Sequence, residues 1–571
     1  MRSATAATSF CAERQAVLRV ALCAVLVAEC LTAAGAGLEA PEARATARLI
    51  ARATDAAYGP ELVASLPLLG AELDEVVTSA PLRIVLRARS GSPLDARRLA
   101  TALAASGRVD YAVPEVFWPM ELRSRHVPND PLFPEQWTLE NTGQGGGRER
   151  ADVGAAAAWG LTLGSPEVII AVLDDGVQLD HPDLAENIRG AGRDFTVYPP
   201  VDGADPRTTS DRHGTSVAGV VAARGDNGIG VTGICPRCTI LPVRVVGSSN
   251  LGTAAAFRWA VAQGAAVITN SWGYARAAPP ADDAVRDAID AAARDGRNGR
   301  GTLVVFGMTN DSVDNCGAHA DISSLESVLA VGVSNHHDDI GGSGFGPCMD
   351  LVAPAKPRDR DTLGVTTTDR TGIDGHTSGD YYTGFGGTSA AAPLVAGIAG
   401  LLLSLNPDLT RADLQHILEH TADKIDPDDA AYDAAGFSSR AGYGRVNAAR
   451  ALVPTVKIAV TPARVAPGEP FSVTVSASAP FGLRSVSWRG RATGIAGLDA
   501  PHETELGGAV VDSITWSGLA IDTPGTFALE ADAVDGGPDS PRRGYPHRAS
   551  EAAPVPAAEI TVLERADGVS R

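Results

Sequence analysis

The strongest constraint on the fold is a series of short apolar runs that alternate with alanine-rich segments between residues 126 and 452. The runs are Val168–Leu173, Ile240–Val246, Val267–Thr269, Leu303–Phe306 and Val328–Val333. Each is too short for a helix and mostly uninterrupted by polar residues, which is typical of parallel strands covered on both faces. Because helices alternate with these strands, the region is predicted to be an α/β domain with a doubly wound, mainly parallel sheet.

The segment before this region, residues 37–125, has a different pattern. It holds an apolar strand (Leu82–Leu86), a helix rich in Ala and Leu (Leu94–Ala105) and a second strand (Val109–Val113). This spacing predicts a small α+β domain placed before the larger one.

The last part of the chain, residues 455–565, has the pattern of an all-β module. Segments such as VKIAVTPARVAPGEPFSVTVSAS alternate apolar and polar residues between Pro and Gly turns, which predicts an antiparallel, Ig-like β-sandwich. Trp488 and Trp516 are interpreted as core residues of this sandwich rather than as a ligand platform. Such a module can bind a surface or a substrate, or it can stabilise the preceding domain.

Residues 1–36 have the pattern of a secretory signal peptide. Arg14 and Arg19 precede an apolar run over residues 20–37, which ends in small residues near Ala34-Gly35-Ala36. A membrane anchor is the alternative, which the short run and Glu29 within it disfavour. We therefore expect secretion to an extracellular or periplasmic space, and a monomeric mature form that has no transmembrane segment.

Charge and cysteine content restrict the partners and the compartment. The formal charge of −20 argues against a nucleic-acid partner. Beyond the leader the chain has Cys235, Cys238, Cys316 and Cys348, which in an exported protein suggest two disulfides. The simplest pairing joins Cys235 to Cys238 and Cys316 to Cys348. A redox-active CPRC motif or half of a zinc site is the alternative for the first pair.

Three segments of the α/β region carry the side chains of nucleophilic catalysis. The first apolar strand runs into Asp174, at the strand end where open α/β sheets form their sites. His213 begins a helix of small residues, and Ser389 begins a long apolar helix that ends near Leu405. Each alone has an ordinary explanation, such as a helix cap or a buried histidine. Together, in the order Asp, His, Ser and each on a Gly-containing turn, they predict a catalytic triad.

These segments resemble the subtilisin-like serine proteases, in which the triad has the same chain order. The resemblance covers Asp130–Leu452 and rests on VLDDGVQLDHPDL, RHGTSVAGVVAA, ILPVRVV, NSWG and GGTSAAAPLVAGIAGLLL. The paired Asp174-Asp175 and the opening PNDPLFPEQW look like the kexin-type branch of this family. The resemblance implies a peptidase domain over residues 126–452 that hydrolyses protein or peptide substrates through an acyl-enzyme, with Asp174, His213 and Ser389 as its triad.

The resemblance also implies a second donor to the oxyanion that forms during the reaction. The family places an Asn after the strand that corresponds to Leu303–Phe306, and Asn310 stands there. Thr309 precedes it where the family usually has Gly, whose backbone freedom a β-branched residue lacks. Loss of one such donor lowers turnover by about 10²–10³, so a misplaced Asn310 would weaken the activity rather than abolish it.

Substrate recognition in this family resembles strand addition to extended backbone on both sides of a cleft. Ser271, Trp272 and Gly273 match one wall of the cleft, and Gly247–Gly252 is a candidate for the opposite edge. The kexin-type branch has acidic groups just past the first wall, whereas this chain has Arg276. Because like charges repel, the sequence predicts broad specificity with an apolar or uncharged residue before the scissile bond.

A structural calcium ion is the cofactor that the resemblance implies. Asp130, Asp183 and Asn227 match positions whose side chains build the main calcium site of the family, with carbonyl oxygens from residues 224–231 completing it. Oxygen donors from separate loops suit a hard cation with six to eight ligands. The alternative is that Asp183 caps a helix and the other two residues stabilise turns.

By the same resemblance, residues 37–125 are predicted to be a propeptide that acts as an intramolecular inhibitor and is removed by self-cleavage between Val116 and Pro128.

A catalytically impaired homologue that acts as a binding protein is the alternative to an active zymogen. An esterase-type α/β hydrolase is a further alternative. That class orders its triad Ser, Asp, His around G-x-S-x-G, and here Ala391 replaces the final Gly.

Overall fold

The structure of the chain is a computed structural model that describes most of residues 125–562 and parts of the segment before them. The described residues are 44–53, 71–79, 82–89, 99, 103, 109–117, 125–274, 282–317, 320–357, 362–433, 435–481, 483–490, 502–506, 510–519, 525–535 and 557–562. The predicted signal peptide and most of the predicted helix 94–105 lie outside them. The chain divides into two compact units, Met1–Glu121 and Leu122–Arg571.

The described part of the first unit is an antiparallel sheet. Its strands lie in the order β2 (Ala71–Ser79), β3 (Leu82–Ala88), β1 (Arg44–Ala53) and β4 (Val109–Phe117). β3 pairs with β1 and β2, and β1 also pairs with β4. The sequence predicted β3 and β4 but missed β1 and β2, whose apolar residues are interrupted by Arg, Asp and Glu. The role of this unit as a propeptide stays a prediction.

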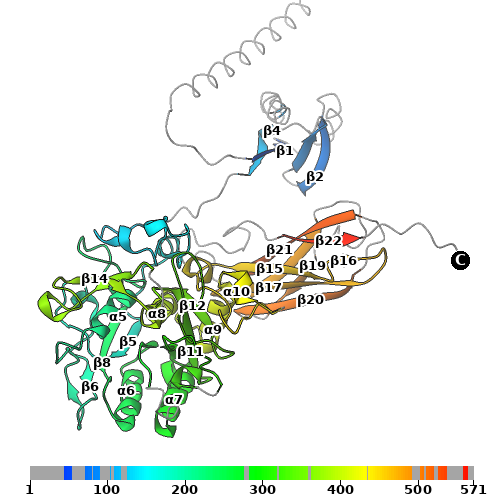
Figure 1. Ribbon diagram of the computed structural model, residues 1–571. Coiled ribbons are helices and arrows are strands. Elements are labelled where there is room, and N and C mark those ends of the chain that lie inside the picture. The colour runs from blue at the N-terminus through cyan, green and yellow to red at the C-terminus, as the bar shows by residue number, and fades with distance from the viewer. Residues whose placement is uncertain are drawn as a thin grey trace, which may run out of the picture. The chain divides into compact units, whose positions relative to one another are not determined.

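The second unit is built on an eight-stranded, mainly parallel sheet in the order β12-β11-β10-β9-β5-β8-β6-β7 (Figure 1). β6 and β7 pair antiparallel, and the other neighbours pair parallel. This confirms the predicted α/β class. The strands are β5 (Ile169–Asp174), β6 (Arg193–Asp194), β7 (Val201–Asp202), β8 (Thr239–Arg244), β9 (Val267–Asn270), β10 (Leu303–Gly307), β11 (Val328–Ser334) and β12 (Leu351–Pro354).

The strand order reverses at β5. From β5 the chain first builds β6 and β8 on one side and then crosses over to add β9 on the other side. In open α/β sheets the carboxyl ends of the strands next to such a reversal leave a crevice where ligands bind. Asp174 at the end of β5 and the residues that follow Asn270 at the end of β9 therefore come to the same edge of the sheet.

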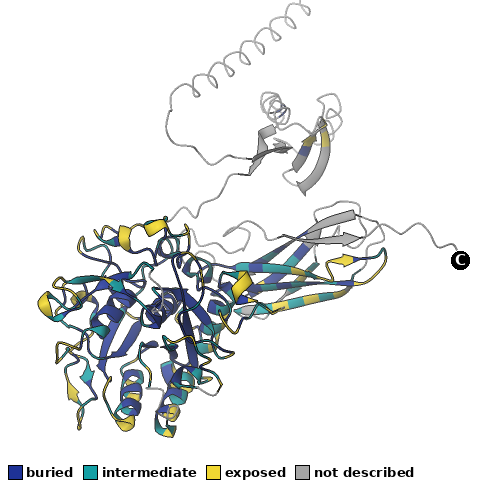
Figure 2. Cartoon of the chain, viewed as in Figure 1, coloured by how far each residue is buried: buried dark blue, intermediate teal, exposed yellow. Residues whose placement is uncertain are grey.

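Helices cover both faces of the sheet, as Figures 1 and 2 show. α5 (His213–Ala222) and α8 (Thr388–Leu405) pack on one face, and α6 (Asn250–Ala262) and α7 (Asp283–Gly299) pack on the other. In β5, Ile170 and Val172 belong to the first core, whereas Ala171 and Leu173 belong to the second. Because successive side chains of a strand point to opposite faces, a strand buried on both faces is apolar throughout.

One helix in the described part of the chain, α8, is long and apolar enough to cross a membrane by length and composition alone. Its most apolar window is 83% buried inside the protein. It contacts α5 and several strands of the sheet, so it is the central helix of the larger core.

The remaining elements surround this layer. They are α4 (Ala155–Trp159), α9 (Arg411–Thr421), α10 (Pro427–Ala430), α11 (Ala448–Ala451), the antiparallel pair β13 (Val365–Thr368) and β14 (Tyr381–Phe385), and the short 3₁₀ helices η3 (Phe133–Glu135), η4 (Gln144–Gly146), η5 (Ala185–Asn187), η6 (Ile322–Ser324) and η7 (Gly372–Asp374). α9 begins with a capping box, in which Thr410 and Asp413 each satisfy a backbone N–H of the other.

The C-terminal strands form two sheets with one shared core. β15 (Thr455–Thr461), β17 (Phe471–Ser478) and β20 (Val511–Leu519) form the first sheet, and the second has the order β16 (Arg464–Val465), β22 (Ala557–Val562), β21 (Gly525–Asp535), β18 (Leu483–Gly490) and β19 (His502–Glu505). Trp488 is buried between the sheets, and Trp516 is partly buried against the same core, as predicted. The Ig-like assignment of the module stays a prediction.

Two disulfides join the cysteines in the pairing expected from the sequence. Cys235 is bonded to Cys238 in the turn before β8, and Cys316 is bonded to Cys348. Cys235 and Cys238 are fully buried in the larger core. A buried disulfide of this kind leaves no free thiolate for zinc or for redox exchange.

Candidate active site

Asp174 is the last residue of β5 and is almost completely buried. Its Oδ1 accepts a hydrogen bond from His213 Nδ1 at 2.8 Å and another from the backbone N–H of Asp175 at 2.8 Å. The strand register fixes the backbone on which this carboxylate sits, since Asp174 is opposite Arg244 of β8 and its carbonyl accepts the N–H of Val245 at 2.8 Å. The structure thus brings Asp174 and His213 together.

His213 is the first residue of α5, and Asp175 holds that helix start in place. The two carboxylate oxygens of Asp175 accept the backbone N–H of His213 at 3.1 Å and that of Gly214 at 2.7 Å. A Cβ on Gly214 would lie 2.3 Å from the carbonyl oxygen of Gly176, so only glycine allows the helix to approach the Asp loop this closely. Asp175 therefore works as a helix cap that links the Asp174 loop to His213.

The carboxylates around His213 stabilise its protonated form relative to an ordinary histidine. Burial lowers the pKa of His213, but the nearby charges of Asp174 and Asp175 outweigh burial, so the pKa lies above its ordinary value. Burial, together with the charge of Asp174, raises the pKa of Asp175 to about 6. The His213 ring also packs edge-on against Phe385, with ring centroids 5.5 Å apart, which limits its rotation.

Ser389 lies in the first turn of α8, which the chain reaches directly from β14. Its Oγ donates to the carbonyl oxygen of Ser271 at 3.4 Å, and Ser271 Oγ donates to the carbonyl oxygen of Ser389 at 3.1 Å. Ser271 follows β9, the direct neighbour of β5. The reciprocal bonds therefore anchor the start of α8 to the sheet edge that carries Asp174.

Asn310 lies in the loop after β10 and faces the same helix start. Its Oδ1 accepts the backbone N–H of Thr388 at 2.9 Å, which leaves the other end of the amide, Nδ2, to face away from that bond. Thr309 is not among the residues with positive φ, so this position does not require glycine. Thr309 Oγ1 donates to Asn315 Oδ1 at 2.8 Å, and this hydrogen bond within the loop after β10 stabilises its conformation.

The expected substrate wall, Ser271 to Gly273, follows β9 directly. Trp272 Nε1 donates to the carbonyl oxygen of Leu173 at 2.8 Å, which fixes the wall to the residue before Asp174. Asp321 is a neighbour that the sequence reasoning missed: its Oδ2 is 3.8 Å from the position that a Cβ on Gly273 would take. Asp321 is far from the NSWG motif in the sequence, and no motif around it indicated this contact. Arg276 lies outside the described residues.

The three predicted metal ligands also come together. Asn227 donates its backbone N–H to Asp130 Oδ1 at 3.3 Å and its Nδ2 to Asp183 Oδ1 at 2.7 Å. Asp183 Oδ2 accepts the N–H of Val231 at 2.8 Å, so the loop 224–231 wraps around a fully buried carboxylate. Asp183 therefore does not cap η5 through a side-chain bond, which corrects the alternative reading of it as a simple helix cap.

The charge of this loop cluster suits a cation. Burial, with the charge of Asp226 nearby, raises the pKa of Asp130, and burial with the charge of Asp130 raises the pKa of Asp183 to about 6. No Lys or Arg forms an ion pair with Asp130 or Asp183 in the part of the chain that the structure describes. Within the same residues no three His, Cys, Asp or Glu side chains gather, so a cation here would need amide and carbonyl oxygens as well.

A profile of the subtilase family matches residues 165–444, which include Asp174, His213, Asn310 and Ser389. This region of the chain is a subtilase-family domain. The matched region begins just before β5 and ends after α10, so it contains the whole parallel sheet and both helices that carry His213 and Ser389.

Individual relatives carry protease names. The chain is 37% identical over 351 residues to the calcium-dependent protease of Trichormus variabilis, covering 56% of this chain and 51% of that protein. It is 34% identical over 317 residues to neuroendocrine convertase 2 of Drosophila melanogaster, covering 51% of this chain and 44% of that protein. The chain thus spans about half the length of the curated relatives it matches.

Among solved structures, the serine protease of Aeromonas sobria in complex with its chaperone aligns with a TM-score of 0.53 and 18% sequence identity, covering 78% of this chain and 95% of that one. At this level of identity the likeness concerns the fold alone. It agrees with the α/β architecture of the second unit.

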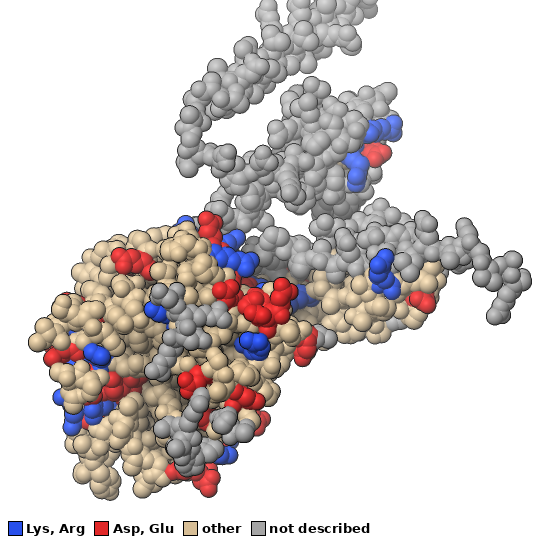
Figure 3. All heavy atoms as spheres, in the orientation of Figure 1, with Lys and Arg blue, Asp and Glu red and all other residues tan. Residues whose placement is uncertain are grey.

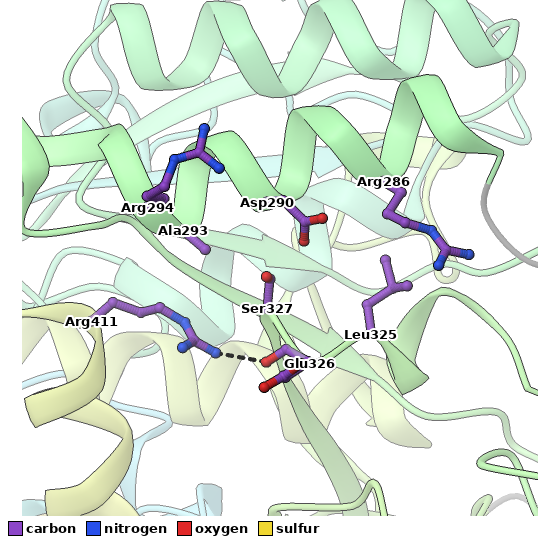
Figure 4. Close-up of a pocket in the computed structure, with 8 residues that line it drawn as sticks. All are labelled: Arg286, Asp290, Ala293, Arg294, Leu325, Glu326, Ser327 and Arg411. Carbon is purple, nitrogen blue, oxygen red and sulfur yellow. Dashed lines mark hydrogen bonds between the residues drawn. The ribbon is translucent and has the colours of Figure 1, made fainter.

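Two surface features lie outside this site. A hollow of about 480 Å³ is lined mainly by polar and charged side chains of α7, the segment before β11 and α9. Figure 4 shows these side chains and the hydrogen bond of 2.9 Å that Arg411 donates to the carbonyl oxygen of Glu326. None of the predicted catalytic residues lines it. On the face shown in Figure 3, basic and acidic side chains of the described residues are interspersed, without a continuous basic surface.

Proposed function

We propose that this protein is a serine endopeptidase that hydrolyses peptide bonds through Asp174, His213 and Ser389. The observation that carries the proposal is the hydrogen bond between the buried Asp174 carboxylate and His213 Nδ1, at the same sheet edge to which the start of α8 is anchored. The match of this region to the subtilase family supports it.

In the proposed reaction, His213 takes the hydroxyl proton of Ser389 as the oxygen attacks the carbonyl carbon of the scissile bond. Asp174 accepts the hydrogen bond from Nδ1, which leaves Nε2 as the basic nitrogen and stabilises the imidazolium that forms. His213 then gives the proton to the leaving amine, and a water molecule activated in the same way releases the acyl-enzyme. The raised pKa of His213 fits a group that must hold a proton for part of the cycle.

The oxyanion that forms in each half-reaction requires fixed donors. In the first turn of α8, the N–H of Thr388 donates to Asn310 and that of Ala390 donates to the carbonyl oxygen of Gly387. The N–H of Ser389 is therefore the proposed backbone donor, and the helix dipole adds positive potential there. Asn310 is the proposed second donor, since its Oδ1 is held by the Thr388 N–H and its Nδ2 remains available. Donors fixed before the reaction stabilise the transition state without reorganisation.

A structural calcium ion is proposed at the loop cluster of Asp130, Asp183 and Asn227. The supporting observation is that two buried carboxylates lie in one loop cluster without a described cationic partner. The ion would be held by these side chains and by carbonyl oxygens of residues 224–231, and it would supply a positive charge to the carboxylates of Asp130 and Asp183. The relative of Trichormus variabilis is named a calcium-dependent protease, in line with this proposal.

The remaining parts of the proposal concern the whole chain. We propose that it is secreted, that residues 37–125 are a propeptide removed by self-cleavage, and that specificity is broad. The two disulfides, Cys235–Cys238 and Cys316–Cys348, support an oxidising compartment.

The experiment is labelling of the purified protein with a fluorophosphonate probe, alongside hydrolysis of an unfolded protein substrate, with and without calcium. Labelling and hydrolysis should both occur in the wild type and both disappear in Ser389→Ala. A matched control is Ser216→Ala, which removes a buried hydroxyl in α5 that makes no recorded hydrogen bond and lies outside the proposed triad. A folded wild-type protein that shows neither labelling nor hydrolysis would overturn the proposal and favour a binding function.

A further inference from the structure

Arg244 is a buried charged residue to which the proposed mechanism assigns no role. It is the last residue of β8, directly opposite Asp174 in the sheet, and only 8% of it is exposed. Burial of a guanidinium is costly unless its N–H groups are paired. The hydrogen-bond partners of the Arg244 guanidinium therefore indicate which loops this side chain holds in place.

The guanidinium donates to both loops that carry the proposed Asp and His. Arg244 Nε donates to the carbonyl oxygen of Asp175 at 2.9 Å, one residue after Asp174. Arg244 Nη2 donates to Asp211 Oδ2 at 2.8 Å, close before His213 in the chain. A planar guanidinium fixes the directions of its donors, so it sets the spacing and the orientation of the two loops at once.

Both contacts continue to His213. Asp175, whose carbonyl oxygen Arg244 holds, accepts the backbone N–H of His213 with its carboxylate. Asp211, whose carboxylate Arg244 holds, also accepts the backbone N–H groups of Arg207 at 2.9 Å and Thr208 at 3.0 Å, which closes the loop that leads into α5. One connection from this side chain thus ends at the backbone N–H of His213, and the other fixes the loop that comes just before His213 in the chain.

The third arm of the network fixes Arg244 itself. Its Nη1 donates to Thr196 Oγ1 at 2.6 Å and to Asp194 Oδ2 at 3.4 Å, and Asp194 also pairs with Arg207 at 2.7 Å. Asp194 is fully buried, and Asp211 is nearly so. These bonds leave the guanidinium little freedom to rotate, which a residue that positions others requires.

We infer that Arg244 is a positioning residue for the Asp174–His213 pair, acting through the Asp175 carbonyl and the Asp211 carboxylate. The inference rests on the proposed function, because that function treats the Asp174–His213 pair as part of the catalytic triad. Arg244 touches neither the reacting serine nor the substrate wall in the described contacts, so its effect should be on the geometry of the pair and not on substrate binding.

The experiment compares Arg244→Met with Arg445→Met. Arg445 is the matched control because it is also buried and also paired with two carboxylates, Asp338 and Asp423, but it lies outside the proposed site. Both variants should lower the midpoint of thermal unfolding. Arg244→Met should in addition lower kcat by about 10–10²-fold with little change in KM, since small misplacement of catalytic groups costs this much. Arg445→Met should leave kcat and KM close to wild type at a temperature where it is folded.

A double-mutant cycle separates positioning from general damage. Asp211→Asn should lower kcat on its own, and the effects of Arg244→Met and Asp211→Asn should be strongly non-additive because they act through one contact. Arg244→Met and Arg445→Met should be additive. If Arg244→Met does not fold, Arg244→Lys replaces it in the same cycle, since Lys keeps the charge but cannot hold both loops with a rigid fork.

A readout independent of turnover keeps this inference distinct from the proposed function. In the Ser389→Ala protein, the strongly deshielded proton NMR signal of the Asp174–His213 hydrogen bond should be present, should be lost or shifted by Arg244→Met, and should be unchanged by Arg445→Met. Failure of wild-type labelling would reject the proposed function alone. A signal and a kcat that respond equally to both arginine variants, or additive effects of Arg244 and Asp211, would overturn the role of Arg244.

Discussion

Gly387→Ala is the substitution whose effect the structure defines most closely. Gly387 stands directly before α8 with φ +69°, and a Cβ added there would lie 2.4 Å from Asn310 Oδ1. The variant therefore changes two things: it puts a side chain on left-handed backbone, and it pushes on the amide of the proposed oxyanion donor.

The two effects have different sizes and different readouts. Gly387 has φ +69° and ψ −172°, a backbone region that is essentially open to glycine alone and costs other residues about 1–3 kcal/mol. This cost should appear as a lower stability. Relief of the 2.4 Å contact to the 3.0 Å that real Cβ atoms respect moves Asn310 by at least about 0.6 Å. Since complete loss of one such donor costs about 10²–10³ in turnover, and a shift of about 1 Å costs about 10², we expect kcat to fall by about 10–10²-fold.

The assay measures kcat and KM on a peptide ester and on the matching amide, together with thermal unfolding. Gly190→Ala is the control, because Gly190 has a similar φ of +63° but a Cβ there would meet no atom within 4 Å. Both variants should lose stability, and only Gly387→Ala should lose kcat. Equal activity of the two variants would refute the reasoning, since it would mean that the Asn310 amide has no part in turnover or is not displaced.

Three further predictions follow from buried or newly noticed carboxylates. Asp183→Asn should lose most of the rise in thermal midpoint that calcium produces in the wild type, measured by differential scanning calorimetry with calcium and with chelator; an unchanged rise would reject the site. Burial and the charge of Glu419 raise the pKa of Asp350 to about 7 from 3.8, so the folded state holds a proton that the unfolded state releases, and stability should fall as pH rises from about 4 to 7. Asp350→Asn should flatten this fall in a pH series of unfolding midpoints, and a parallel profile would contradict the assignment. Asp321→Asn should lower cleavage after Arg relative to Leu by about tenfold, because its carboxylate lies beside Gly273; an unchanged ratio of kcat/KM would leave the predicted preference for an uncharged residue in place.

Sequence reasoning succeeded where local pattern and burial coincide. The runs that become β5 and β8 to β11 are mainly apolar because both faces of each strand are buried, so periodicity located them closely. It missed β12, which has four residues, and β6 and β7, which have two residues each and hold Arg or Asp, so neither gives an apolar run. The disulfide pairing was also found, because few alternatives remained.

The candidate site divides in the same way. Asp174, His213 and Ser389 each stand at the boundary of an element, next to a Gly-containing turn, and such boundaries can be read from the chain. Arg244 and Asp321 gave no comparable signal. Each lies in an ordinary-looking segment, and each gains its importance only from a contact with residues far away in the chain.

The sequence by itself determined the chemical groups of this protein, the strand and helix boundaries that carry them, and the family that its α/β region matches. Only the tertiary structure decided which groups far apart in the chain form hydrogen bonds or ion pairs with one another. The physical reason is that hydrophobic periodicity depends on whether a residue is buried, which neighbouring residues reveal. A hydrogen bond or an ion pair depends on distances of about 3 Å, and only the crossover connections and the register of the folded sheet set these.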